Sequence, residues 1–209
     1  MPTPPCDDPE GRRLGRPRSA EADGAILAAA TELFCAHGLD GMSVEAIANR
    51  AGVSKATIYR RYPSKVEIVV AAAWCLSGPA WPVPDTGETR EDLSIHLRNL
   101  ARMLQTTELG RAMPMLLAEK QRNPELAEAH HKFVAERRTA TRGILERGIE
   151  RGDVDPRADL ELMMDMLSAP LFYRQYHSGA SLGPAVTDAI VDAVLRSFAP
   201  APTAKRPPH

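Results

Sequence analysis

The sequence predicts an all-α protein with a small N-terminal helical domain and a larger C-terminal helical domain. Apolar residues recur at helical spacing along most of the 209-residue chain, and no stretch alternates apolar and polar residues as a strand would. Residues 77–86 contain one glycine and three prolines, which is typical of a linker between domains. We therefore expect a flexible Arg/Pro-rich arm over residues 1–18, a first domain over 19–77, a second domain over 86–199 and a disordered tail over 200–209.

Glycines and capping residues divide the first domain into the three helices of a helix-turn-helix module and a fourth helix that follows them. The first is predicted over residues 20–37, because Gly38 follows its last apolar residues and suits a C-cap. Ser43 and Ser54 can cap the second and third helices, and the third is predicted over residues 55–62. A fourth helix, ending near residue 76, is expected to begin at the capping box of Ser64 and Glu67.

The second domain is predicted to be helical throughout. Asn123 and Pro124 suit the start of its longest helix, and Asp155 with Pro156 suits the start of the next. Prolines are expected to interrupt one helix at Pro114 and to kink another at Pro170. The expected helices cover residues 88–105, 108–122, 124–151, a stretch after 156 that includes 160–171, and 185–198.

Residues 44–58 have the spacing of a helix-turn-helix motif. Two short helices that cross steeply need a small residue at the crossing and a residue that tolerates the tight turn. Ala48 and Gly52 occupy those places, and the four positions that must be apolar are occupied by Ile47, Ala51, Val53 and Ile58. The alternative is a chance pair of amphipathic helices in an all-α protein.

The third helix presents a polar face when Ile58 points into the core. At about 100° per residue, Ala56 and Arg60 then point outward, with Thr57 and Tyr59 on the flanks. Lys and Arg bind phosphates, and Thr, Tyr and Arg can reach base edges. The alternative for each of these residues is a solvated surface side chain.

The chain resembles the TetR family of regulators over residues 20–70. The resemblance rests on residues 52–65, GVSKATIYRRYPSK, and on residues 34–39, FCAHGL. It implies that Lys65 contacts a phosphate and that serines at two helix starts face the DNA backbone. The family usually has glycine where this chain has Ala56, and often histidine where it has Arg61. The residues expected to bind DNA are Ser43, Ser54, Lys55, Ala56, Thr57, Tyr59, Arg60, Arg61 and Lys65.

The same resemblance implies that the second domain binds a small-molecule effector and forms a homodimer. Such modules work as dimers on palindromic operators, because one recognition helix reads only a few base pairs. The candidate interface residues are Leu167, Leu171, Phe172, Tyr176, Ile190, Val194 and Phe198, and some of them are also expected in the intramolecular core. The candidate effector-pocket residues are Met103, Met113, Met115, Phe133, Met163 and Met166, for which ordinary core packing is the alternative.

The charge distribution agrees with a DNA-binding N-terminal domain. The whole chain has a net charge of −1, but residues 11–66 carry nine Lys/Arg against five Asp/Glu. Four arginines of the arm, Arg12, Arg13, Arg16 and Arg18, can enter a minor groove or simply solubilise the tail.

Other classes of protein lack support in the sequence. We find no phosphate-binding glycine loop, nucleophile elbow, zinc-binding helix motif or Cys–His pairing, so an enzyme, a metal site and a cofactor are not expected. The three cysteines lack metal-ligand spacing, no stretch approaches the roughly 20 apolar residues of a membrane span, and the acidic start is unlike a signal peptide. We expect a cytoplasmic transcriptional regulator, a repressor released by its effector, with an activator or a ligand-independent regulator as the alternative.

Overall fold

The computed structural model describes residues 18–76 and 82–200 and confirms the all-α prediction. Within these ranges every regular element is a helix and no strand occurs. Most of the predicted arm, part of the linker and the predicted tail after residue 200 lie outside the described residues. In the part of the chain described, no helix combines the length and the apolar character required to span a bilayer.

Contacts divide the chain into two compact units that differ from a simple linear division. Unit 1 contains the described residues up to Leu76 together with residues 103–136, and unit 2 contains residues 82–102 and 137–200. Helices α5 (Thr89–Thr106) and α7 (Pro124–Arg151) therefore contribute to both units. The sequence pattern reveals which face of a helix is apolar but not which partner covers it, so the position of this boundary could not be predicted.

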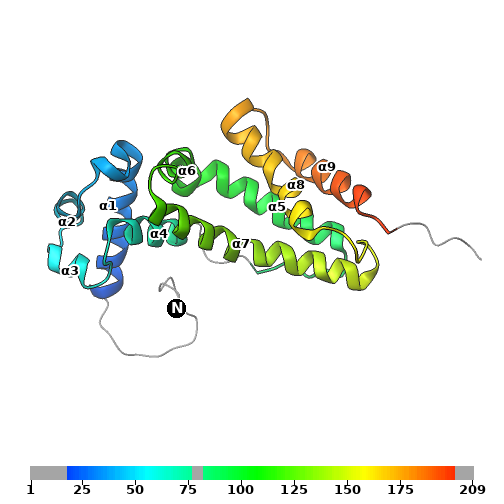
Figure 1. Cartoon of the computed structure of the whole chain (residues 1–209), viewed down its shortest axis with the longest axis horizontal. Coiled ribbons are helices and arrows are strands. Elements are labelled where there is room, and N and C mark those ends of the chain that lie inside the picture. Colours follow the sequence, from blue (N-terminus) through cyan, green and yellow to red (C-terminus); the bar gives the residue numbers. More distant parts are fainter. Residues whose placement is uncertain (1–17, 77–81, 201–209) are drawn as a thin grey trace, which may run out of the picture. The chain divides into compact units, whose positions relative to one another are not determined.

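Unit 1 packs five helices and the start of α7 around one apolar core. Helix α1 contacts α2, α4 and α6, and Figure 1 shows α2 and α3 on one side of α1 and α4 and α6 on the other. The fully buried side chains include Ile26, Ile47, Ile58, Ile68 and Leu109. The helices of this unit are α1 (Arg18–Gly41), α2 (Val44–Ala51), α3 (Lys55–Tyr59), α4 (Lys65–Leu76) and α6 (Glu108–Glu119).

Gly38 ends the regular part of α1, as the sequence predicts. Its φ of 67° lies in the left-handed region that favours glycine, and the chain turns there before residues 39–41. A β-carbon at this position would also lie 2.7 Å from Oε1 of Glu119 on α6. That atom is the far end of a flexible side chain that can move aside, so it is the turn that favours glycine here.

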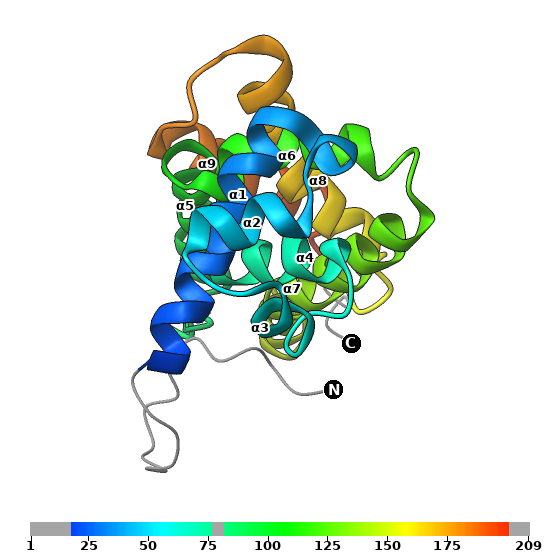
Figure 2. The ribbon, with the colours of Figure 1, turned by 90° about the vertical axis from the view of Figure 1, so that its left-hand side faces the viewer.

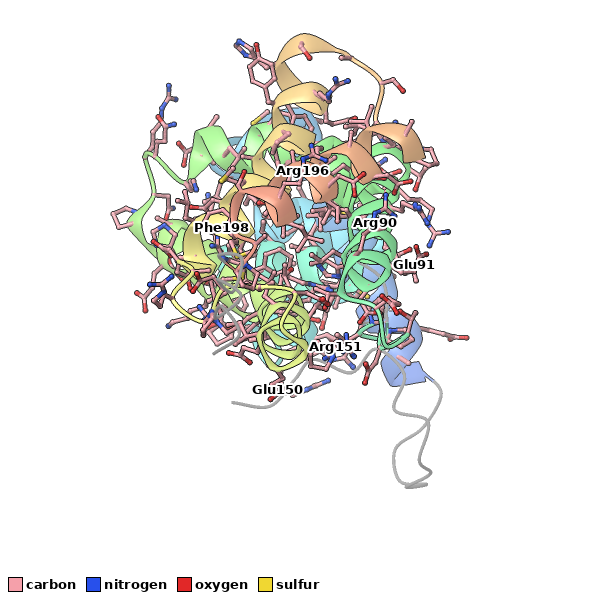
Figure 3. All side chains as sticks on the ribbon, turned by 90° about the vertical axis from the view of Figure 1, so that its right-hand side faces the viewer. Arg90, Glu91, Glu150, Arg151, Arg196 and Phe198 are labelled. Atoms are coloured by element: carbon pink, nitrogen blue, oxygen red, sulfur yellow. The ribbon has the colours of Figure 1, made fainter. Side chains whose placement is uncertain are left out.

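Unit 2 joins α5 and the second half of α7 to α8 (Leu160–Tyr173), the π-helical turn η1 (Arg174–Ser178) and α9 (Pro184–Ser197). Two arginines of α5 bind carboxylates of α9: Arg90 Nε lies 2.6 Å from Asp192 Oδ1, and Arg98 Nη2 lies 2.8 Å from Asp188 Oδ1. Figure 3 shows the end of this unit at which Arg90 of α5, Arg151 of α7 and Phe198 after α9 are labelled.

A buried carboxylate attaches the segment before α5 to unit 2. Asp92 is fully buried and accepts hydrogen bonds from the backbone N–H of Thr86 at 2.7 Å and from Arg151 Nη1 at 3.3 Å. Burial opposes its ionisation, but the bonds from Thr86 and Arg151 outweigh burial and lower the pKa of Asp92. Residues 84–88 are thereby tied to both α5 and α7.

Most predicted helix bounds are confirmed, and the exceptions have local causes. Helix α3 ends at Tyr59 rather than at Tyr62: the N–H of Arg61 donates to the carbonyl of Ile58, three residues back, and Pro63 disfavours a helical conformation for Tyr62. Asp155 does not cap α8: its carboxylate binds the backbone N–H of Arg157, and Asp159 caps the helix by accepting from the N–H of Leu162 at 3.1 Å.

The two internal prolines do not interrupt their helices. Helix α6 continues through Pro114, and α8 continues through Pro170 before it widens into η1. A proline costs one N–H donor, and a helix whose apolar face is buried by neighbours can tolerate that loss.

We predict that His130 makes the stability of the protein depend on pH. Burial, followed by the positive charges of Lys120 and His131, lowers the pKa of His130 to about 4. Between its unfolded pKa of about 6.5 and pH 4 the unfolded chain binds a proton that the folded chain does not, so the free energy of unfolding falls as the pH falls. Between pH 7.5 and 4.5 the natural protein should lose about 2 kcal/mol more than His130→Leu, measured by urea unfolding.

The comparison with His130→Leu isolates this residue. Burial also lowers the pKa of His96, and hence adds a pH dependence of the same sign, but it does so in both proteins. Equal losses in the two proteins would contradict the prediction.

Candidate nucleic-acid interface

Caps at both helix starts and a left-handed glycine build the turn between α2 and α3. The Ser43 hydroxyl accepts from the N–H of Ala46 at 3.1 Å, and the Ser54 hydroxyl accepts from the N–H of Thr57 at 3.1 Å. Gly52 has a φ of 65°, and its N–H donates to the carbonyl of Ala48. The caps and the turn lie at the residues where the sequence predicts them.

Apolar residues of the motif hold the two helices against α1. Ile47, Ala48 and Ile58 are buried, whereas Ala51 and Val53 are half-buried. The side chain of Ile58 fixes the rotation of α3, because it points into the core and forces the opposite face of the helix outward. Figure 2 shows α2 and α3 in the view from the left-hand side of Figure 1.

Replacing Gly52 by valine is expected to destabilise unit 1 by about 2 kcal/mol. A β-branched residue is strained at a positive φ, although no atom lies within 4 Å of the position that its β-carbon would occupy. Asparagine tolerates this conformation better, so Gly52→Asn should cost less. Thermal unfolding of both variants tests the prediction, and a valine variant as stable as the asparagine variant would contradict it.

The outward face of α3 carries a cation, a small residue and an aromatic ring. Ala56 and Arg60 are exposed, and Tyr59 is 56% exposed, which is unusual for a tyrosine without a surface partner. Thr57 is half-buried, and its hydroxyl lies 2.9 Å from that of Ser54. Lys55 is exposed and its ammonium lies 3.3 Å from a carboxylate oxygen of Glu45 on α2. This face can donate to phosphates and to base edges in a major groove.

Arg61 and Lys65, two further predicted DNA contacts, also have partners within the protein. Arg61 Nη1 lies 2.5 Å from Asp23 Oδ1 of α1. Lys65 Nζ donates to the carbonyl of Leu39 at 2.6 Å, near the end of α1. An ammonium has three donors, so Lys65 retains two for a further acceptor.

The structure adds two residues that the sequence reasoning missed. Asp23 of α1 binds Arg61, and Glu125 at the start of α7 accepts from the hydroxyl of Ser64 at 2.9 Å, in the turn after α3. Both bonds join segments far apart in the chain, and a surface carboxylate carries no sequence signal for such a partner.

The candidate effector and interface residues fall into different environments. Met103, Met113 and Phe133 of unit 1 are buried and Met115 is half-buried, whereas in unit 2 Met163 is buried and Met166 is exposed. Leu167, Leu171 and Val194 are buried within one protomer and belong to its core. Phe172, Tyr176, Ile190 and Phe198 are half-buried.

Unit 1 contains two small apolar cavities against α4. The first, of about 20 Å³, lies between α1, α4 and α6 and is bordered by Phe34, Val69 and Leu109. The second, of about 10 Å³, lies between α4, α6 and α7 and is bordered by His130 and Phe133. Both are large enough for about one water molecule, so any larger molecule must move the helices apart.

Two family models match the chain and together cover most of it. Residues 26–72 match the model described as bacterial regulatory proteins of the tetR family. Residues 83–194 match the model described as a tetracyclin repressor-like C-terminal domain. The first match contains the whole helix-turn-helix motif, and the second contains α5 to α8 and most of α9.

Individual proteins are similar over nearly their full length. The HTH-type transcriptional regulator YdeS of Bacillus subtilis is 36% identical over 188 residues, which cover 89% of this chain and 92% of that protein. The DNA-binding transcriptional repressor TetR of Mycobacteroides abscessus is 31% identical over 183 residues, 87% of this chain and 93% of that protein. The crystal structure of the TetR family transcription regulator SCO0332 superimposes with a TM-score of 0.63 at 28% identity, covering 86% of this chain and 100% of that one.

Proposed function

Because the chain belongs to the TetR family of DNA-binding transcriptional regulators, we propose that it is a homodimeric repressor released by a small apolar effector. In this proposal two copies bind a palindromic operator, and each copy inserts α3 into a major groove. The main support for the proposal is that Tyr59 and Arg60 are exposed on the outward face of a helix that is fixed at both ends. The protein then acts in the cytoplasm, where the DNA lies, and by binding rather than by catalysis.

An exposed apolar stripe on α8 supports a dimer and replaces part of the interface expected from the sequence. Leu162, Met166 and Tyr173 are 48%, 37% and 59% exposed, and with the exposed Ala169 they follow the spacing of one helix face. This face is opposite the buried one that contains Leu167. A monomer rarely leaves such a stripe in water, and a second copy can cover it.

The outward residues of α9 extend the same proposed interface. Ala185, Ala189 and Ala193 are exposed and lie four residues apart, so they form a smooth strip along a helix that contacts α8. Small side chains allow another helix to approach closely. We therefore propose that α8 and α9 of two copies form a four-helix interface, with Phe172, Tyr176, Ile190 and Phe198 at its margins.

The cavities of unit 1 support an apolar effector that acts through α4. Helix α4 follows the recognition helix directly and begins with Lys65. An uncharged aromatic or aliphatic molecule that widened either cavity would shift α4 relative to α1 and α6, because a packed core moves in discrete steps. Phe133 borders one of these cavities, and Met103, Met113, Met115, Met163 and Met166 remain further candidates for contact with the effector.

A footprinting experiment tests the proposal. Full-length protein is titrated against the intergenic DNA that flanks its own gene, and the protected region is mapped. We expect a palindromic site with half-sites one helical turn apart, or a multiple of it, and higher transcription from that promoter when the gene is deleted. If a site is protected but transcription from that promoter falls when the gene is deleted, the protein is an activator instead. If no sequence is protected, the flanking intergenic DNA does not contain the operator.

A further inference from the structure

One carboxylate of α1 interacts with Arg61 and Tyr62, which lie in the turn just after the recognition helix. Arg61 Nη1 lies 2.5 Å from Asp23 Oδ1, and the two side chains are 19% and 23% exposed. The Tyr62 hydroxyl faces the same carboxylate, and burial first, then the charge of Asp23, raises the pKa of Tyr62 to about 12. This pair is much better shielded from water than the Arg50–Glu32 pair between α2 and α1, whose side chains are 58% and 57% exposed.

The recognition helix needs such an anchor because it is short. Helix α3 has five residues, and a helix of that length has no independent stability in water. Its start is fixed by the Ser54 cap and its middle by the buried Ile58. Its end continues into a turn in which the N–H groups of Arg61 and Tyr62 both donate to the carbonyl of Ile58 at 2.9 Å. The bonds to Asp23 hold that turn against α1.

We propose that Asp23 is a positioning residue for DNA recognition, and that Arg61 acts through Asp23 rather than as a phosphate contact. The proposal rests on α3 being the helix that enters the DNA groove. Asp23 sets the direction of Tyr59 and Arg60, which stand immediately before the anchored pair. An arginine committed to a shielded carboxylate adds little to the charge that the operator meets, because the pair is nearly neutral at a distance.

The test is a double-mutant cycle on the full-length protein. The variants D23N, R61Q and D23N/R61Q are titrated against the duplex that the natural protein selects from a random-sequence pool, at several salt concentrations. Each single variant is expected to bind about 3- to 30-fold more weakly, and the double variant no more weakly than either single one. The slope of log affinity against log salt should stay unchanged, whereas R60Q should reduce its magnitude by about 0.9.

Matched variants separate positioning from loss of folding. E32Q removes the charge of Glu32 from the exposed Glu32–Arg50 pair, which joins α1 to α2. It should change operator affinity less than twofold, within the range of about 0–1 kcal/mol for surface pairs. Y62F removes the hydroxyl that faces Asp23 and should weaken selective binding in the same direction as D23N, with an unchanged unfolding temperature. Affinity for random-sequence DNA should not fall in D23N, because the substitution removes a negative charge, so selectivity falls.

Three results would overturn the proposal. They are a reduction of the salt slope in R61Q like that of R60Q, additive losses in the double variant, and full operator affinity in D23N. If instead R60Q and Y59A also bind normally, α3 is not the reading helix and the proposed function fails with it.

Discussion

Replacing Tyr59 by alanine is expected to weaken operator binding by about 1–3 kcal/mol and to leave the free energy of unfolding unchanged. Tyr59 lies on the outward face of α3 with more than half of its surface exposed, so its truncation removes no core packing. In a major groove the ring can cover a thymine methyl group and the hydroxyl can bond a base edge or a phosphate. Titration of the selected duplex with Tyr59→Ala and Tyr59→Phe separates the ring from the hydroxyl.

Arg60 is expected to act differently from Tyr59 although it is its neighbour. Arg60→Gln removes a charge, so affinity should become less dependent on salt by about one counterion. Tyr59→Ala should instead keep the salt dependence and change which base pairs are preferred. The matched control is Arg157→Gln, because Arg157 is an 83% exposed arginine in unit 2, on the segment before α8.

Normal affinity in both Tyr59→Ala and Arg60→Gln would exclude α3 as the reading helix. A drop in unfolding temperature that accompanied the loss of affinity would assign the residue to the fold instead. Far-UV circular dichroism and thermal unfolding of each variant therefore belong to the same experiment.

The helix-turn-helix could be predicted from the sequence because each of its requirements is local. A cap depends on a serine and an N–H three residues later, and the turn depends on one glycine at a positive φ. Neighbouring residues decide both features, and nothing elsewhere in the fold has to be known. The buried Ile47 and Ile58 follow from the same spacing.

Partners that come from distant parts of the chain could not be predicted. Arg61 looks like a DNA contact until Asp23, 38 residues earlier, is placed beside it. Competition between nearby residues also misleads: Asp155 and Asp159 both suit a cap, and the bond from Asp155 to Arg157 leaves the cap to Asp159. The sequence lacked the one fact that decides each case, which is the location of the competing hydrogen-bond partner.

Helix α8 shows the same limit for apolar patterns. It carries two apolar faces, and its sequence pattern predicts the interface on the face that contains Leu167 and Leu171. Folding buries that face within the protomer and leaves the face with Leu162, Met166 and Tyr173 exposed. Periodicity finds apolar stripes, but only the packing of α8 against its neighbours decides which stripe is left for another molecule.

Replacing Met166 by aspartate is therefore expected to convert the proposed dimer into a monomer. Met166 lies in the middle of the exposed stripe of α8, so the dimer would have to bury its charge without a partner. In the monomer the side chain faces water, and the unfolding free energy should change by less than about 0.5 kcal/mol. Analytical ultracentrifugation at micromolar concentration measures the association directly.

Two controls distinguish interface from core and from general surface effects. Val83→Asp places the same charge on an exposed apolar residue of unit 2 that belongs to the segment before α5 and to neither α8 nor α9, and should leave the association unchanged. Leu167→Ala removes a buried side chain and should cost about 2–5 kcal/mol of stability in the protomer. If Leu167→Ala dissociated the protein at unchanged stability, the buried face would be the interface after all.

Loss of the dimer is expected to have the largest effect on operator binding. A monomer reads one half-site with a five-residue helix, whereas a dimer binds its second half-site as an intramolecular event. Met166→Asp should therefore weaken binding to the palindromic duplex by at least about 100-fold, although it lies on α8 rather than on the DNA-binding helices. Binding to a duplex with a single half-site should be unchanged, because α3 and its anchors are intact. Equal losses on the two duplexes would mean that the substitution had damaged the reading helix, and undiminished binding to the palindrome would mean that α8 does not hold the two copies together.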